Sequence, residues 1–153
     1  MNEDIETAKD FIRATLDVLK TMAFLEAKAG TPYVKKDRTA EGDVSAIIGV
    51  TGDRTGTISV SFSRACALAL VRGMLGDSVE DIVQDTRDAV GELANMVSGQ
   101  ARASLAARGI VMQGSTPSVI MGVGHHISHQ SGRPVMAIPF SAESGEFTVE
   151  FCF

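Results

Sequence analysis

The amino-acid sequence predicts an α/β protein of the α+β-like sandwich kind, with long helices packed on a mixed, largely antiparallel β-sheet. Residues 4–22 and 81–108 repeat apolar side chains at the spacing of an amphipathic helix. Residues 57–62 and 147–153 alternate apolar and polar side chains, as strands with one buried face do. Turn-forming residues precede both alternating runs, which favours hairpins.

Length and composition indicate one globular domain over residues 1–153. The chain has 14 basic and 19 acidic residues, and its formal net charge of −5 argues against nucleic acid as a partner. No run of about 20 apolar residues and no basic leader sequence is present, so we expect a cytoplasmic protein without a membrane partner. Cys66 and Cys152 lack the spacing of metal ligands, which leaves no predicted metal site.

The N-terminal third of the chain is predicted to form a helix, a loop and a hairpin. The helix runs from residue 4 to about residue 22, and residues 28–42 form a connecting loop with a short extended piece at Tyr33-Val34. The β-rich runs 44–50 and 57–62 flank turn-forming residues and form the hairpin. The charged side chains of the helix are expected to face water, and they are Glu6, Asp10, Arg13, Asp17 and Lys20.

The middle of the chain contains two predicted helices. Ser63 is a suitable N-cap for the first helix, which runs to residue 75 and ends at Gly76. The second helix begins near residue 81 or 85, continues to residue 108 and ends at Gly109.

The C-terminal third is predicted to be β-rich. After Pro117, residues 119–121 and 135–140 form another extended pair, and a turn at residues 144–146 leads into a last strand, residues 147–153. Because that strand is apolar at every odd position, we expect it inside the sheet. Ile48-Gly49-Val50 and Met121-Gly122-Val123 each precede a hairpin, which suggests a degenerate α-β-β duplication.

The long helix carries the strongest functional signal. Opposite its apolar stripe, Asp88, Glu92, Asn95, Gly99 and Arg102 follow one another at helical steps, so Glu92 and Asn95 project the same way. Glycine inside a helix costs about 0.5–1 kcal/mol relative to alanine, and Gly91 and Gly99 flank this pair. A surface that approaches the helix backbone closely is one explanation; a merely solvated face is the other. The apolar stripe consists of Ala89, Val90, Leu93, Ala94, Met96, Val97 and Ala101.

The segment Asp88-Ala89-Val90-Gly91-Glu92-Leu93-Ala94-Asn95 resembles the Asp/Ser-x-x-x-Glu-x-x-Asn motif of the CheC, CheX and FliY chemotaxis phosphatases. In that family a proline follows further along the chain, where Pro117 stands here. Residues 19–24, 42–45, 48–52 and 149–153 also look CheX-like, so the resemblance extends over nearly the whole chain. CheC-type proteins carry the motif twice, and its single occurrence here favours the CheX branch.

The resemblance implies hydrolysis of the aspartyl phosphate on a CheY-like response regulator, which itself supplies Mg²⁺ and a lysine. This chain then needs no cofactor of its own. Asn95 would orient the attacking water and Glu92 would pair with the regulator's lysine. Asp88, Gly91, Gly99 and Arg102 would form the docking surface, and the family also implies a homodimer through the β-sheet. Alternatives are a non-catalytic regulator-binding module and a structural component associated with the flagellar switch.

Two other motifs are assigned structural roles. On a strand, His125 and His129 would lie about 13 Å apart, too far to chelate a metal together. We therefore expect the cluster His125-His126-x-x-His129 to be surface strand residues, near a dimer contact. The glycine-rich run 49–56 lacks the Lys-Ser/Thr of a nucleotide-binding loop, so it is interpreted as a hairpin turn.

Overall fold

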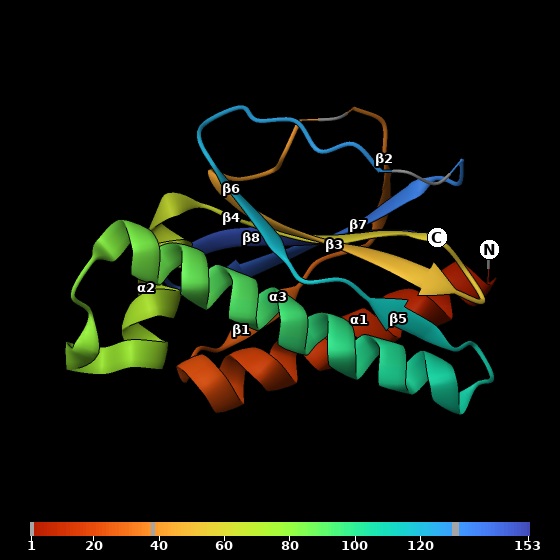
Figure 1. Cartoon of the computed structure of the whole chain (residues 1–153), viewed down its shortest axis with the longest axis horizontal. Helices are drawn as coiled ribbons and strands as arrows, with labels where there is room; N and C mark the ends of the chain where they lie inside the picture. Colours follow the sequence, from red (N-terminus) through yellow and green to blue (C-terminus); the bar gives the residue numbers. More distant parts are fainter. Residues whose placement is uncertain (1, 38, 130–131) are drawn as a thin grey trace.

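A computed structural model describes residues 2–37, 39–129 and 132–153. Arg38, in the predicted charged loop, and Gln130 and Ser131, in the expected turn after the histidines, lie outside these residues. Three long helices lie together against one face of a single eight-stranded sheet (Figure 1). In the part of the chain that the structure describes, no helix is both long enough and apolar enough to span a bilayer.

The sheet is antiparallel at every pairing between its strands, which confirms the predicted fold class. Its order is β1-β7-β8-β4-β3-β5, with β2 also on β7 and β6 also on β3. The glycine-rich run is the turn of the β3–β4 hairpin, as predicted. The strands are β1 (Ala27–Ala29), β2 (Tyr33–Lys35), β3 (Val44–Gly52), β4 (Gly56–Phe62), β5 (Met112–Gly114), β6 (Ser118–Met121), β7 (Val135–Ala142) and β8 (Gly145–Cys152).

The helices begin and end close to the residues that the sequence indicates. They are α1 (Asn2–Ala23), α2 (Arg64–Leu75) and α3 (Ile82–Ala107), with a 3₁₀ turn, Gly76–Ser78, after α2. The Ser63 hydroxyl caps α2 by accepting the Cys66 N–H at 3.2 Å. The Asp81 carboxylate caps α3 by accepting the N–H groups of residues 83 and 84. Gly109 follows α3 with a φ of +88°, a value that glycine adopts without strain.

The hydrophobic core lies between the helices and the sheet. Strand alternation explains which residues enter it: Ile58, Val60 and Phe62 of β4 face the helices, while the serines between them face away. Phe11 of α1 stacks on Phe151 of β8, with ring centroids 4.9 Å apart. Strand β8 lies between β7 and β4, which confirms its predicted interior position.

Two predicted features of the strands and of α1 are wrong. Strand β6 pairs with β3, not with β7, because the chain returns from α3 to the edge of the first hairpin. Asp10, expected to face water, is buried, and its carboxylate lies 2.7 Å from the guanidinium of Arg108. The end of α3 supplies this partner, since α1 and α3 pack along each other.

The sheet face opposite the helices is also covered. The segments between β2 and β3 and between β6 and β7 pass over it (Figure 1). Beneath them, Ser45, Ser59, Ser61 and Glu150 are buried although they point away from the helices. This face is therefore a second, polar interior.

Candidate active surface

The predicted motif lies on the outward face of α3. Asp88, Glu92 and Asn95 are exposed there, while the predicted apolar stripe of the same helix is buried or partly buried against the core. Beside them is an open hollow of about 360 Å³ between α3 and the segment that leads into β6. The hollow is lined by Arg87, Asp88, Gly91, Glu92 and Asn95 of α3 and by Thr116, Pro117 and Val119.

Hydrogen bonds fix the surroundings of the motif. The Gln84 side-chain amide donates to Asp88 Oδ1 at 2.9 Å, one turn earlier on the helix. The Arg87 guanidinium donates to the carbonyl oxygen of Val119 at 3.1 Å and so ties α3 to β6. These contacts hold both walls of the hollow in place.

Glu92 and Asn95 contrast with these neighbours. Among the described residues, neither side chain has a hydrogen-bond or ion-pair partner. Glu92 offers carboxylate acceptors, and Asn95 offers an amide that both donates and accepts. Both groups are therefore available to water or to a partner molecule.

The two glycines that flank the motif have different surroundings. Gly91 is buried, and a Cβ there would lie 3.4 Å from Val119 Cγ2 and 4.0 Å from Pro117 Cβ. A Cβ at Gly99 would have no atom within 4 Å in the part of the chain that the structure describes. The small residue at position 91 thus lets the segment at Pro117 sit on the helix, whereas the space at Gly99 is open.

Arg102, the last residue of the predicted face, is occupied within the chain. Its guanidinium donates to Ser98 Oγ at 3.1 Å and to the carbonyl oxygen of Met112 at 3.4 Å. It also lies against Gly114 of β5. The side chain therefore braces the short strand that follows α3.

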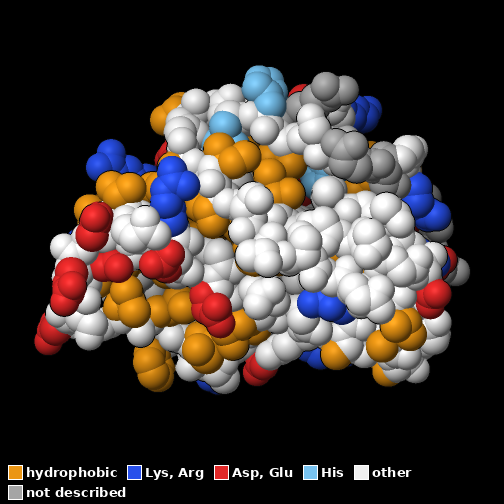
Figure 2. Space-filling model, viewed as in Figure 1, with side chains coloured by type: hydrophobic (Ala, Val, Ile, Leu, Met, Phe, Trp, Pro, Cys, Tyr) orange, Lys and Arg blue, Asp and Glu red, His pale blue; other side chains and the backbone are white. Residues whose placement is uncertain are grey.

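The negative charge of the protein is concentrated around this surface. Residues 77–92 contain six carboxylates and one arginine, a formal charge of −5, while the rest of the chain has 13 residues of each sign. Figure 2 shows acidic side chains gathered at the end of the molecule where α2 and the start of α3 meet. Such a field favours a cationic partner.

The histidine cluster is not a row of surface strand residues, and that prediction is wrong. His125 and His129 belong to the segment that covers the polar face of the sheet, and only His126 is exposed. His125 Nε2 lies 2.6 Å from Ser45 Oγ. Among the described residues, no group of three or more His, Cys, Asp or Glu side chains could hold a metal ion.

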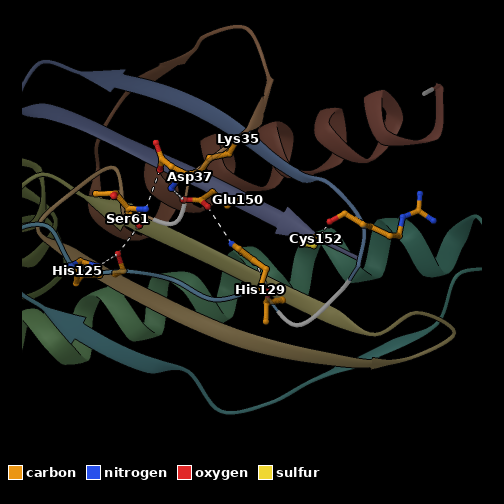
Figure 3. A network of polar contacts seen from close by, with 11 residues as sticks. Lys35, Asp37, Ser61, His125, His129, Glu150 and Cys152 are labelled. Carbon is orange, nitrogen blue, oxygen red and sulfur yellow. Dashed lines mark hydrogen bonds and ion pairs between the residues drawn. The ribbon is translucent and has the colours of Figure 1, made fainter.

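His129 belongs to a buried polar network (Figure 3). Its Nε2 lies 3.2 Å from Glu150 Oε1, and the Lys35 ammonium lies 3.0 Å from Glu150 Oε2. The side chains of Lys35 and Glu150 are only 3% and 1% exposed. Sequence reasoning missed this network; its one signal was a glutamate between the apolar residues of the predicted last strand, residues 147–153.

Comparison with known proteins agrees with the fold and with the predicted family. Residues 44–141 match the family model described as chemotaxis phosphatase CheX. The crystal structure of CheX from Desulfovibrio desulfuricans has a TM-score of 0.91 and 59% identity, over 96% of this chain and 98% of that one. The CheY-P phosphatase CheX of Thermotoga maritima is 25% identical over 144 residues, 94% of this chain and 92% of that protein.

A more distant structure shares the fold. It is the CheX-CheY-BeF₃-Mg²⁺ complex from Borrelia burgdorferi, with a TM-score of 0.80 and 24% identity over 95% of this chain and 96% of that one. The family model covers most of the chain, and the Desulfovibrio structure extends the similarity to nearly all of it. The resemblance seen in the motif is confirmed: the chain belongs to the chemotaxis phosphatase CheX family.

Proposed function

We propose that residues 1–153 act as a single phosphatase domain that hydrolyses the aspartyl phosphate of a CheY-like response regulator. The observation that carries this proposal is the pair Glu92 and Asn95, exposed and unpartnered among the described residues, on the outward face of α3 where the acidic segment 77–92 ends. The name of the Thermotoga relative, a CheY-P phosphatase, supports the substrate. The Borrelia CheX was crystallised with CheY and Mg²⁺, which supports a metal that belongs to the regulator.

Asn95 is assigned the catalytic role. Phosphoryl transfer is accelerated mainly by positioning and by stabilisation of charge. An amide carbonyl accepts a hydrogen bond from the attacking water and stays neutral beside the phosphoryl group. Since α3 is a continuous helix packed on the core and Asn95 is on its exposed face, the amide can enter the regulator's pocket without a change in fold.

Glu92 is assigned the docking contact. Its carboxylate, one turn from Asn95, forms a charge-assisted hydrogen bond with the regulator's lysine and sets the register of α3 in the pocket. Asp88, held by Gln84, extends the same acidic row. The open space at Gly99 admits the regulator, while Gly91 and Arg102 act by holding the Pro117 segment and β5 in place.

We also propose a homodimer formed through the β-sheet. The edge strand β2 pairs with β7 alone among the described residues, so it leaves one row of backbone groups for a second copy. Because β2 is three residues long, the paired region is expected to be short. Light scattering coupled to size exclusion tests this, and a single species of 16.1 kDa contradicts it.

The decisive experiment measures the loss of phosphate from a phosphorylated CheY in the presence of this protein. Asn95→Ala is expected to lower the stimulated rate about a hundredfold or more, because it removes the group that positions the water. Glu92→Ala is expected to raise KM and to lower kcat. Gln100→Ala, which removes another exposed amide from α3, is the matched control and should keep the wild-type rate.

The rival functions give different results in the same assay. A non-catalytic binding module would bind the regulator without accelerating the loss of phosphate. A component of the flagellar switch would bind motor proteins and leave CheY-P untouched. Full activity in both Asn95→Ala and Glu92→Ala would refute the proposed roles of these residues.

A further inference from the structure

A second hollow, of about 280 Å³, lies at the N-terminal end of α3. Three of its lining side chains are large, apolar and exposed: Ile82 at 44%, Val83 at 55% and Val123 at 90%. Exposed apolar side chains that gather around one concave site indicate an interaction surface. The groove, as we call it, is completed mainly by Ala67, Leu68 and Met121.

The groove continues the candidate active surface. Both hollows follow the seam between α3 and the residues from 116 to 123, and the Arg87–Val119 hydrogen bond lies where one gives way to the other. Along α3, Val83 and Asn95 are separated by about 18 Å, at 1.5 Å per residue. An ordinary protein interface, which buries about 800 Å² on each partner, is large enough to cover both the groove and the hollow beside Asn95.

The exposed wall of the groove is held in place from behind. Val123 stands between Gly122 and Gly124, whose φ values of +147° and +72° favour glycine. The Gly122 N–H donates to the carbonyl oxygen of Asp43 at 2.8 Å, and its carbonyl oxygen lies 2.6 Å from His125 Nδ1. The other ring nitrogen of His125 contacts Ser45, so the polar interior anchors this turn. A preorganised apolar side chain loses little conformational entropy on binding.

Charge indicates what kind of partner fits. The lining of the groove contains one charged side chain of each sign, Asp43 and Arg64, and the groove opens at the N-terminal end of α3, where the segment 77–92 carries a formal charge of −5. Figure 2 shows hydrophobic side chains next to these acidic ones. An apolar side chain flanked by lysine or arginine is complementary to both features.

We propose that the groove receives an apolar side chain, flanked by basic residues, from the phosphorylated response regulator. This side chain binds in the groove while Glu92 and Asn95 contact the phosphorylation site. The groove therefore increases the affinity for the regulator, and the α3 motif accelerates the hydrolysis of its phosphate. This inference rests on the proposed function, because it names a second contact for the same partner.

The test measures binding and turnover separately. The probe is CheY from Desulfovibrio desulfuricans, activated with BeF₃⁻ and Mg²⁺ for titration calorimetry and phosphorylated by a small phosphodonor for kinetics. In Val83→Ser/Val123→Ser we expect the Kd to rise about tenfold or more and KM to rise with it, with kcat unchanged. The matched control is Ile5→Ser/Val111→Ser, two apolar side chains that are 47% and 51% exposed elsewhere, and its Kd should stay within about twofold.

The outcomes separate this inference from the proposed function. An unchanged Kd in the groove variant overturns the inference, even if Asn95→Ala abolishes turnover. A weakened Kd supports it, even if Asn95→Ala keeps full activity and the proposed function fails. If the groove variant instead loses self-association in sedimentation while its Kd for CheY is unchanged, a second copy is the occupant and the inference is wrong. Thermal melting of both variants confirms that each is folded.

Discussion

Glu92 and Asn95 on α3 contrast with the network of Lys35, His129 and Glu150 on the opposite side of the sheet. The first two side chains are exposed, and no partner for them lies among the described residues. The other three side chains are buried, and Lys35 and His129 each contact Glu150, at 3.0 and 3.2 Å. A buried charge needs a partner within the protein, because it has lost its contact with water. An exposed charge stays hydrated and is free to bind a partner molecule. We therefore expect the carboxylate at position 92 to serve binding and the one at position 150 to serve folding.

The largest expected effect tests this contrast directly. Glu150→Ala leaves the Lys35 ammonium buried without its partner, so we expect a loss of about 3–5 kcal/mol in the free energy of unfolding. Glu92→Ala removes the same group from an exposed helix position and should change that free energy by less than about 0.5 kcal/mol. Denaturant unfolding followed by circular dichroism measures both.

A double variant tests whether the destabilisation comes from the unpaired lysine charge and not from the lost glutamate side chain itself. Replacing the buried pair by apolar residues, Lys35→Met/Glu150→Leu, removes both charges together and should restore much of the lost stability. If Glu150→Ala and Glu92→Ala destabilise the protein equally, the distinction between a folding carboxylate and a binding carboxylate fails.

The next effect separates the two glycines beside the motif. At Gly99 an added methyl group meets no atom within 4 Å among the described residues, so Gly99→Ala should stabilise α3 by about 0.5–1 kcal/mol. If the regulator approaches the helix there, the same methyl group raises the KM for CheY-P several-fold. Gly91→Ala, whose methyl contacts Val119 within the chain, is the comparison and should gain less stability.

Thermal unfolding and phosphatase kinetics on the two variants decide the point. A Gly99→Ala variant that is more stable and keeps its wild-type KM would remove Gly99 from the docking surface. Unlike the test of the groove, this one concerns the C-terminal side of the motif, so the two together outline how far along α3 the regulator reaches.

The face of α3 could be predicted from the sequence because it depends on local periodicity alone. A step of three or four residues places Glu92 beside Asn95 whatever the rest of the chain does, and the caps at Asp81 and Gly109 are local signals too. The β3–β4 hairpin was predictable for the same reason, since its turn and its alternation are adjacent in the chain.

The missed features depend on contacts between distant residues or on very short strands. Lys35 and Glu150 are 115 positions apart, and no local pattern links a lysine in a predicted loop with a glutamate in a strand. Strands β1 and β5 have three residues each, too few to show alternation. The partner of β6 is decided by where the long helix returns the chain, which periodicity does not encode.

The smallest expected effect concerns Cys66, a buried thiol on α2. It tests whether burial, without a charged partner, is enough to keep a thiol protonated and unreactive. Burial raises the pKa of the Cys66 thiol from 9.0 to about 11. The unfolded chain therefore loses this proton at lower pH than the folded one. The thiol's contribution to stability is complete below about pH 9 and is lost as the pH rises towards 11.

A Cys152→Ala background leaves Cys66 as the only thiol to react. In the folded protein at pH 8 we expect a disulfide reagent to modify it far more slowly than in the denatured chain, because the thiolate is the nucleophile and burial disfavours it. Equal rates in the two states would contradict the raised pKa. Cys66 is adjacent in the chain to Ala67, which lines the groove. If its thiol reacts slowly, binding at the groove depends on the shape and charge of the groove and not on a covalent reaction with Cys66.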